Sequence, residues 1–183
     1  MPGIPQFARG SSLLEEAFEL ADDAHTGPGR RKNTGIEHPT AVAELLADRG
    51  FDQQVVAAGF LHDVLEDTDT DPDEIVDRFG PEVGGLVAAM TEDPSIEPYE
   101  DRKAEHRARV AANSGAAAIY AADKLAKTRA LMYGGGEISD EKLDHYRQTL
   151  AALREAQPEL PFLPDLEENL RAIEADRQHA TRR

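Results

Sequence analysis

The fold class of this 183-residue chain can be predicted from the stretch DQQVVAAGFLHDVLEDT, Asp52–Thr68. Its apolar side chains recur at helical intervals instead of alternating as in a strand, and Asp52 can cap the helix that follows. Four ionisable side chains interrupt the apolar pattern: His62, Asp63, Glu66 and Asp67. Because residues four apart share one face of a helix, His62 lies over Glu66 and Asp63 over Asp67. The stretch therefore predicts an apolar helix that carries a stripe of ionisable groups.

Outward from this stretch, glycine- and proline-rich breaks separate further segments with helical spacing, and no segment alternates like a strand for long. Ser12 and Glu15 have the spacing of a capping box at the start of the first expected helix. Besides the helix from Asp52 through Leu65, we expect helices over residues 12–25, 38–50, 71–80, 81–91, 99–112, 116–133, 139–156 and 165–177. The predicted fold class is all-α, in a single domain.

The composition excludes several classes of protein. The chain has no cysteine, which rules out disulfides, thiolate metal sites and a thiol nucleophile. Its 20 Lys and Arg against 36 Asp and Glu give a net charge of −16, which repels phosphate backbones and argues against a nucleic-acid binder. No apolar run approaches the roughly 20 residues of a membrane span, and the N-terminal sequence lacks the apolar core of a signal peptide. We therefore expect no membrane association and a cytoplasmic location.

Two further residues extend the candidate site. His38 precedes an expected helix, where a neutral imidazole can bind a metal ion, and Asp123 lies in the apolar run AAAIYAADKLAK, where an unpaired carboxylate is costly. With His62 and Asp63 they form a set of two imidazoles and two carboxylates, which suits Mn, Fe, Co or Zn better than Ca or Mg. Ionisable residues near a helix end are also the ordinary pattern of a solvated face, and this alternative stays open.

These motifs resemble those of metal-dependent HD-domain phosphohydrolases. Within that superfamily they are most similar to the hydrolase domains of RelA/SpoT-type alarmone enzymes and to small alarmone hydrolases such as the metazoan SpoT homologue. The matching segments, which fall between residues 12 and 150, are RRKNTG, HPTAVAELLAD, AAGFLHDVLEDTDTDPDEIVDRFGPEVGGLVAAMTED and ADKLAKTRAL. The resemblance implies a helical HD-domain bundle over residues 12–157, with an N-terminal extension over 1–11. Residues 158–183 would add a C-terminal helix and polar tail that pack on the domain.

The resemblance also implies a reaction and its residues. Such enzymes usually hold one Mn²⁺ and release the 3′-pyrophosphate of guanosine tetra- or pentaphosphate. By motif, the metal ligands would be His38, His62, Asp63 and Asp123. Glu66 and Asp67 would position and deprotonate the attacking water, and Glu66 lies one helical turn after His62, within reach of such a role.

A polyanionic substrate needs local positive charge in a chain of charge −16. We expect phosphate contacts from six basic side chains: Arg30, Arg31, Lys32, Arg102, Lys124 and Lys127. Each of them could equally be an ordinary surface base. The chain departs from the family pattern twice, because the segment Gly35–His38 is short and lacks the usual aromatic residue, and because Lys127 stands where the family usually carries Asn.

The sequence leaves three functions open. The first is Mn²⁺-dependent hydrolysis of guanosine tetraphosphate by a stand-alone enzyme. The second keeps the metal chemistry but changes the substrate to another nucleotide or phosphorylated metabolite, which the two departures suggest. The third is a non-catalytic module that binds nucleotide or metal, against which the Glu66–Asp67 pair argues. The expected partner is a small nucleotide, and a homo-oligomer is left open.

Overall fold

The computed structural model describes residues 3–31, 35–134 and 136–181, and over these ranges the chain forms helices and no strand. The predicted all-α class is confirmed. The elements are a 3₁₀ turn η1 (Gln6–Ala8) and the helices α1 (Ser12–Thr26), α2 (Glu37–Asp48), α3 (Gln53–Leu61), α4 (Val64–Asp67), α5 (Pro72–Met90), α6 (Tyr99–Ala111), α7 (Ser114–Gly134), α8 (Asp140–Ala156) and α9 (Leu163–Thr181). None of the helices in the described ranges combines the length and the apolar character needed to cross a membrane.

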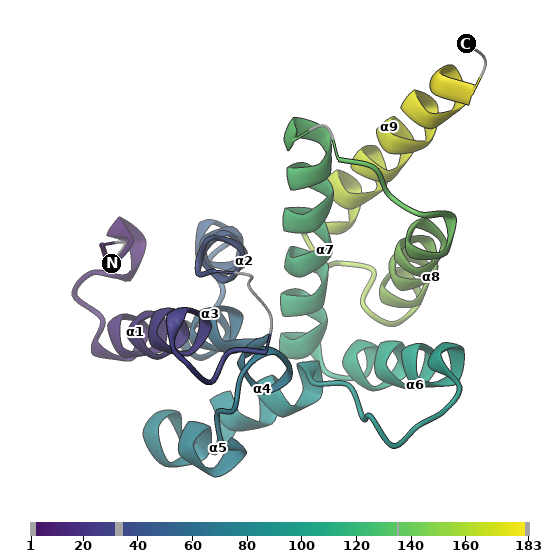
Figure 1. Ribbon diagram of the computed structural model, residues 1–183. Coiled ribbons are helices and arrows are strands. Elements are labelled where there is room, and N and C mark those ends of the chain that lie inside the picture. Colours follow the sequence, from purple (N-terminus) through teal and green to yellow (C-terminus); the bar gives the residue numbers. More distant parts are fainter. Residues whose placement is uncertain (1–2, 32–34, 135, 182–183) are drawn as a thin grey trace.

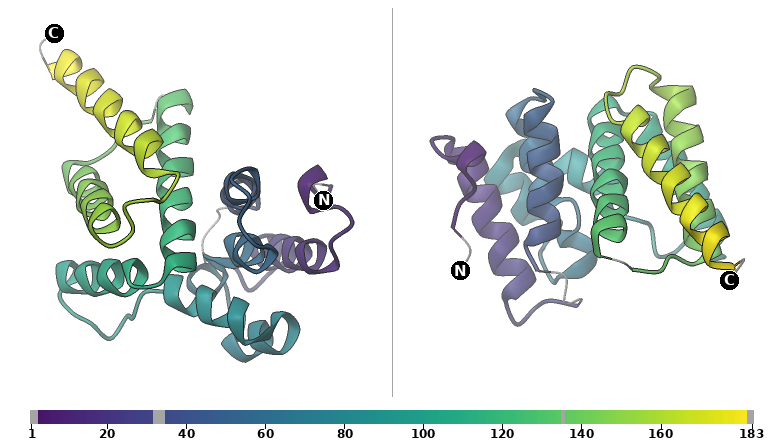
Figure 2. Two further views of the ribbon diagram at one scale, coloured as in Figure 1. Left: turned by 180° about the vertical axis from the view of Figure 1, so that it is seen from behind. Right: turned by 90° about the horizontal axis from the view of Figure 1, so that it is seen from above.

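Helix α7 lies at the centre of the molecule (Figure 1). Helices α2, α3, α5, α6, α8 and α9 all pack against it. Figures 1 and 2 show α1–α5 on one side of α7 and α6, α8 and α9 on the other. The run Ala116–Ala122 is buried on every face, as expected for a helix enclosed by others. Residues from both halves of the molecule therefore meet along α7.

The close packing of α2 on α3 positions the first part of the site. Gly59 of α3 faces α2 so closely that a methyl group added to it would lie 2.6 Å from Leu46 Cδ1 and 3.4 Å from Ala43 Cα. On the other face of α3, the buried Phe60 ring lies 5.7 Å from the rings of both Phe7 and Phe18. Because α3 is packed on both faces, the residues at its C-terminal end have little freedom to move.

The predicted helix through the HD and ED pairs is interrupted, so the expectation of one continuous helix is wrong. Helix α3 ends at Leu61 and α4 begins at Val64, with His62 and Asp63 at the junction. The His62 ring donates from Nδ1 to the carbonyl oxygen of Gly59 at 2.8 Å. In a continuous helix that carbonyl would accept from the backbone N–H of Asp63, so the side chain replaces a helical bond. The backbone N–H of Asp67 still donates to the Asp63 carbonyl at 2.9 Å, which preserves the predicted spacing of these two residues.

Two of the expected helix caps are not formed as predicted. Ser11, and not Ser12, caps α1 by accepting from the backbone N–H of Leu14 at 3.4 Å. Asp52 precedes α3, but its side chain makes no capping hydrogen bond. As expected, the helical path breaks at Gly80: α5 joins two helical segments across a kink at that glycine, whose φ of 84° carries no steric cost in the absence of a Cβ.

Candidate functional site

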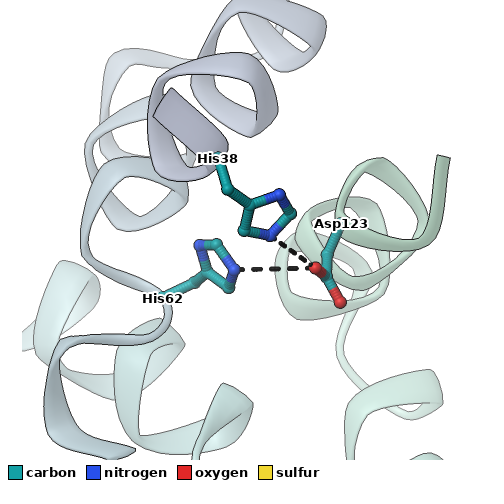
Figure 3. Close-up of side chains that lie close together, drawn as sticks. All are labelled: His38, His62 and Asp123. Carbon is teal, nitrogen blue, oxygen red and sulfur yellow. Dashed lines mark hydrogen bonds and ion pairs between the residues drawn. The ribbon is translucent and has the colours of Figure 1, made fainter. Parts of the chain in front are cut away.

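Three separated segments bring two histidines and two aspartates together. His38 comes from the first turn of α2, His62 and Asp63 from the α3–α4 junction, and Asp123 from α7. His38 Nε2 lies 2.9 Å from Asp123 Oδ1, and His62 Nε2 lies 3.7 Å from the same oxygen (Figure 3). Asp63 Oδ2 lies 3.1 Å from His62 Nε2 and 4.0 Å from His38 Nε2. The potential ligand atoms of His38, His62 and Asp123 all lie within 4.8 Å of one another.

This arrangement fits a divalent cation. Because a carbonyl oxygen only accepts, the bond from His62 to Gly59 places a proton on Nδ1 and turns Nε2 toward the carboxylates. The His62 ring is buried, and its Nε2 makes no hydrogen bond among the described residues. Imidazole nitrogens combined with carboxylate oxygens are the ligand types that transition metals such as Mn, Fe, Co and Zn share.

The electrostatics of the four residues also favour a cation. Burial acts to lower the pKa of His62, but the charges of Asp63 and Asp123 outweigh it and raise that pKa to about 10. Burial likewise acts to raise the pKa of both carboxyl groups, but the neighbouring cationic side chains hold the pKa of each well below its ordinary value. Both aspartates are therefore ionised at neutral pH, and a metal ion that binds here replaces the proton on His62 Nε2.

Two lysines satisfy the buried charge of Asp123. Lys124 Nζ lies 2.6 Å from Asp123 Oδ2, and Lys127 Nζ lies 2.7 Å from Oδ1. The Lys124 ammonium also lies 4.1 Å from the ring centroid of Tyr120 and 5.7 Å from that of Tyr146. Burial acts to lower the pKa of both lysines, but attraction to Asp123 outweighs it and raises each pKa, so both stay charged at neutral pH. Asp123 thus has charged partners within a helix that is otherwise apolar in its first half.

A cavity of about 370 Å³ opens beside this cluster, within the size range of small-molecule sites. The predicted site residues on its walls are His38, Asp63, Glu66, Asp67, Asp123, Lys124 and Lys127. The Glu66 carboxylate accepts from the backbone N–H of Glu92 at 2.8 Å, and the Asp67 side chain is buried. The ED pair therefore borders the same space as the candidate metal ligands.

Of the basic loop that precedes α2, the described residues Arg30 and Arg31 do not line this cavity. Arg30 donates to a backbone carbonyl at the end of α1, and Arg31 forms an ion pair with Asp69 at 3.0 Å. Lys32 lies outside the described residues. The backbone N–H of Arg31 donates to the carbonyl oxygen of Asp67 at 2.5 Å, which ties the loop to the end of the ED segment.

Helices α6 and α7 supply cavity residues that the sequence reasoning did not select. Lys103, His106 and Tyr120 line the cavity, whereas Arg102 lies beside it and pairs with Glu92 at 3.2 Å. Lys103 also forms an ion pair with the Glu92 carboxylate. Lys103 and His106 are three residues apart, and this spacing already indicated that they lie on the same face of the helix. The sequence did not reveal which face of this charged helix turns inward.

The helical fold and the cluster of two imidazoles and two carboxylates together define a class of protein. The HD-domain family model matches residues 17–133, and the chain belongs to this family. The resemblance to alarmone hydrolases that the motifs indicated is confirmed by particular relatives. The chain is 43% identical over 106 residues to the guanosine-3′,5′-bis(diphosphate) 3′-pyrophosphohydrolase of Aquifex aeolicus, a match that covers 56% of this chain and 15% of that protein.

Shorter relatives match over more of their own length. The chain is 34% identical over 126 residues to the guanosine-3′,5′-bis(diphosphate) 3′-pyrophosphohydrolase MESH1 of Mus musculus, which covers 66% of this chain and 70% of that protein. Among solved structures, a metazoan orthologue of SpoT that hydrolyses ppGpp and plays a role in starvation responses superposes with a TM-score of 0.72 at 28% identity. That superposition covers 88% of this chain and 96% of the other. The similarity thus extends to nearly the whole of the solved metazoan chain.

Proposed function

We propose that the chain is a metal-dependent phosphohydrolase that removes the 3′-pyrophosphate from guanosine-3′,5′-bis(diphosphate), and that it acts in the cytoplasm. One observation carries the proposal: four potential metal ligands from three segments converge at a cavity that also exposes an acidic pair and lysines. The names of the bacterial and murine relatives support the choice of substrate. On this proposal, residues 12–157 form the hydrolase domain and residues 158–183 pack on it.

His38, His62, Asp63 and Asp123 would hold one divalent cation, for which we propose Mn²⁺. When bound, such a cation supplies Lewis acidity, which acidifies water and polarises a phosphoryl oxygen. The hydrogen bond from His62 Nδ1 to the Gly59 carbonyl fixes the ring so that Nε2 faces the cation, as is usual for histidine ligands.

Glu66 would accept a proton from the attacking water, because its carboxylate borders the cavity and is held there by the Glu92 backbone N–H. Asp67 would orient that water from its buried position beside Glu66. Lys124 and Lys127 would bind phosphate oxygens at the cavity wall. The remaining predicted contacts would reach parts of the nucleotide that extend past the cavity: Arg30, Arg31, Lys32 and Arg102.

The test is to incubate the purified protein with guanosine tetraphosphate and Mn²⁺ and to measure GDP and pyrophosphate by ion-exchange chromatography. We expect equimolar release of both products, lost on addition of a chelator and strongly reduced in Glu66→Gln. Folded protein that releases neither product with Mn²⁺, Co²⁺, Zn²⁺ or Mg²⁺ would rule the proposal out.

A second candidate function is favoured by Lys127, which replaces the family's usual Asn and lines the cavity. An added positive charge suits a phosphate group, so a different nucleotide or phosphorylated metabolite could be the substrate of the same metal site. A panel of phosphorylated substrates with Mn²⁺ distinguishes the two candidates. Turnover of guanosine tetraphosphate far above that of every other compound would eliminate this alternative.

A further inference from the structure

A single oxygen atom of the site contacts both the candidate ligand set and a lysine. Asp123 Oδ1 lies 2.9 Å from His38 Nε2 and is also 2.7 Å from Lys127 Nζ. A metal ion held by His38, His62 and Asp123 would use the ligand atoms that cluster here. The Lys127 ammonium and the metal ion are therefore drawn to the same carboxylate oxygen.

The two lysines on Asp123 differ in how firmly they are held. Lys124 is 8% exposed, contacts Oδ2, and lies near the rings of Tyr120 and Tyr146. Lys127 is 35% exposed, and no aromatic ring contact of this kind is found for its ammonium among the described residues. Lys127 can therefore leave Asp123 by a change of rotamer into the cavity that it lines, whereas Lys124 remains as the fixed partner of Oδ2.

The charges of the two ligand aspartates are balanced by the two lysines that contact Asp123. Asp63 and Asp123 contribute two negative charges, and Lys124 and Lys127 contribute two positive charges. Two lysine charges beside the ligand carboxylates weaken their attraction for a divalent cation, and a lysine at 2.7 Å from a ligand oxygen repels the cation directly. Removal of Lys127 would leave one aspartate charge without a lysine partner and would free Oδ1 from the ammonium.

We propose that Lys127 competes with the divalent cation for Asp123 Oδ1 and thereby sets the metal affinity of the site. The inference rests on the proposed metal site and deepens it by naming the residue that tunes it. Metal binding displaces the ammonium from Oδ1 to the cavity wall, and loss of metal allows it to return. The affinity of the wild-type chain for Mn²⁺ is accordingly lower than its ligand set alone would give.

The experiment compares Mn²⁺ affinity, by calorimetry in competition with a chelator, in the wild-type protein, Lys127→Met, Lys127→Arg and Lys103→Met. Lys103→Met is the matched control, because Lys103 lines the same cavity but pairs with Glu92, which keeps Arg102 as a second partner. We expect Lys127→Met to bind Mn²⁺ about tenfold more tightly, because it removes a like charge beside a ligand oxygen. Lys127→Arg and Lys103→Met should stay near the wild-type value.

A second readout is the rise in melting temperature on addition of Mn²⁺, which should be larger for Lys127→Met than for the wild type. If Lys127→Met and the wild type bind Mn²⁺ equally, or if Lys103→Met tightens binding as much, the competition is refuted while the metal site stands. If no variant binds any divalent ion, the metal site itself fails and the proposed function fails with it.

Discussion

His106 provides a quantitative test of how the cavity is built. The ring is 3% exposed, and neither ring nitrogen makes a hydrogen bond among the described residues. Burial lowers its pKa to about 4, against an opposing attraction from Glu92. Three nearby cations contribute to the same lowering of the pKa: Lys124, Arg109 and Lys103. The folded protein thus keeps this imidazole neutral at pH values where the unfolded chain protonates it.

The sign of the effect follows from the two pKa values of His106. Its unfolded value is near 6.5 and its folded value is lower, so the unfolded state binds the proton first as the pH falls. Stability from the neutral ring is fully present above pH 6.5 and is lost as the pH falls from there to about 4. The complete loss amounts to about 3 kcal/mol, and the part between pH 7.5 and 5.5 to about 1 kcal/mol.

The perturbation is His106→Phe, which keeps a ring against the edge of Tyr120, 5.2 Å away, and removes the titrating group. Urea unfolding at pH 7.5 and 5.5 measures the free energy of unfolding, and the exposed His179→Gln variant serves as control. We expect the loss of stability on acidification to be about 1 kcal/mol smaller in His106→Phe than in the wild type, and unchanged in His179→Gln. Equal losses in all three proteins would refute the assignment of a buried neutral imidazole.

Three further perturbations test the site and the core. Asp123→Asn should weaken Mn²⁺ binding by about 10- to 100-fold in calorimetry, since it removes the charge shared by both histidines, and an unchanged affinity would exclude Asp123 as a ligand. Glu66→Gln should lower kcat by about 10²- to 10⁴-fold while Mn²⁺ affinity is retained, and a variant with full kcat would exclude Glu66 as the base. Phe60→Ala should lower the free energy of unfolding by about 3–5 kcal/mol in urea, because the buried ring packs between two others, and a loss below about 1 kcal/mol would contradict that packing.

The sequence was informative about those features of the site that depend only on residue type and spacing. His38 and Asp123 lie 85 positions apart, yet their side chains meet, as the combination of ligand types predicted. The break at His62 could not be predicted from periodicity, because it depends on a bond between the ring and a single carbonyl oxygen. His106 was missed because charged helices give no pattern that identifies their inward face until the neighbouring helices are placed.

The contact between Lys127 and Asp123 could be predicted from the local sequence, because residues four apart on a helix share one face. The resemblance to the family assigns Lys127 to substrate binding, whereas helical spacing alone indicates its ion pair with Asp123.

 

The position of α7 explains how one site can combine opposite charges in a strongly acidic chain. The half of the molecule formed by α1–α5 contributes the histidines and the acidic pair, while α6 and α7 contribute the lysines. Asp123 lies where these two sets meet, so its two carboxylate oxygens can serve a metal ion and a lysine at once. On the proposed function, the same arrangement would bring the phosphorus atom under attack to the acidic, metal-holding wall while the lysines neutralise the other phosphates. A substitution on α7 should therefore change metal binding and substrate binding together, whereas substitutions on α2 or α6 should change only one of them.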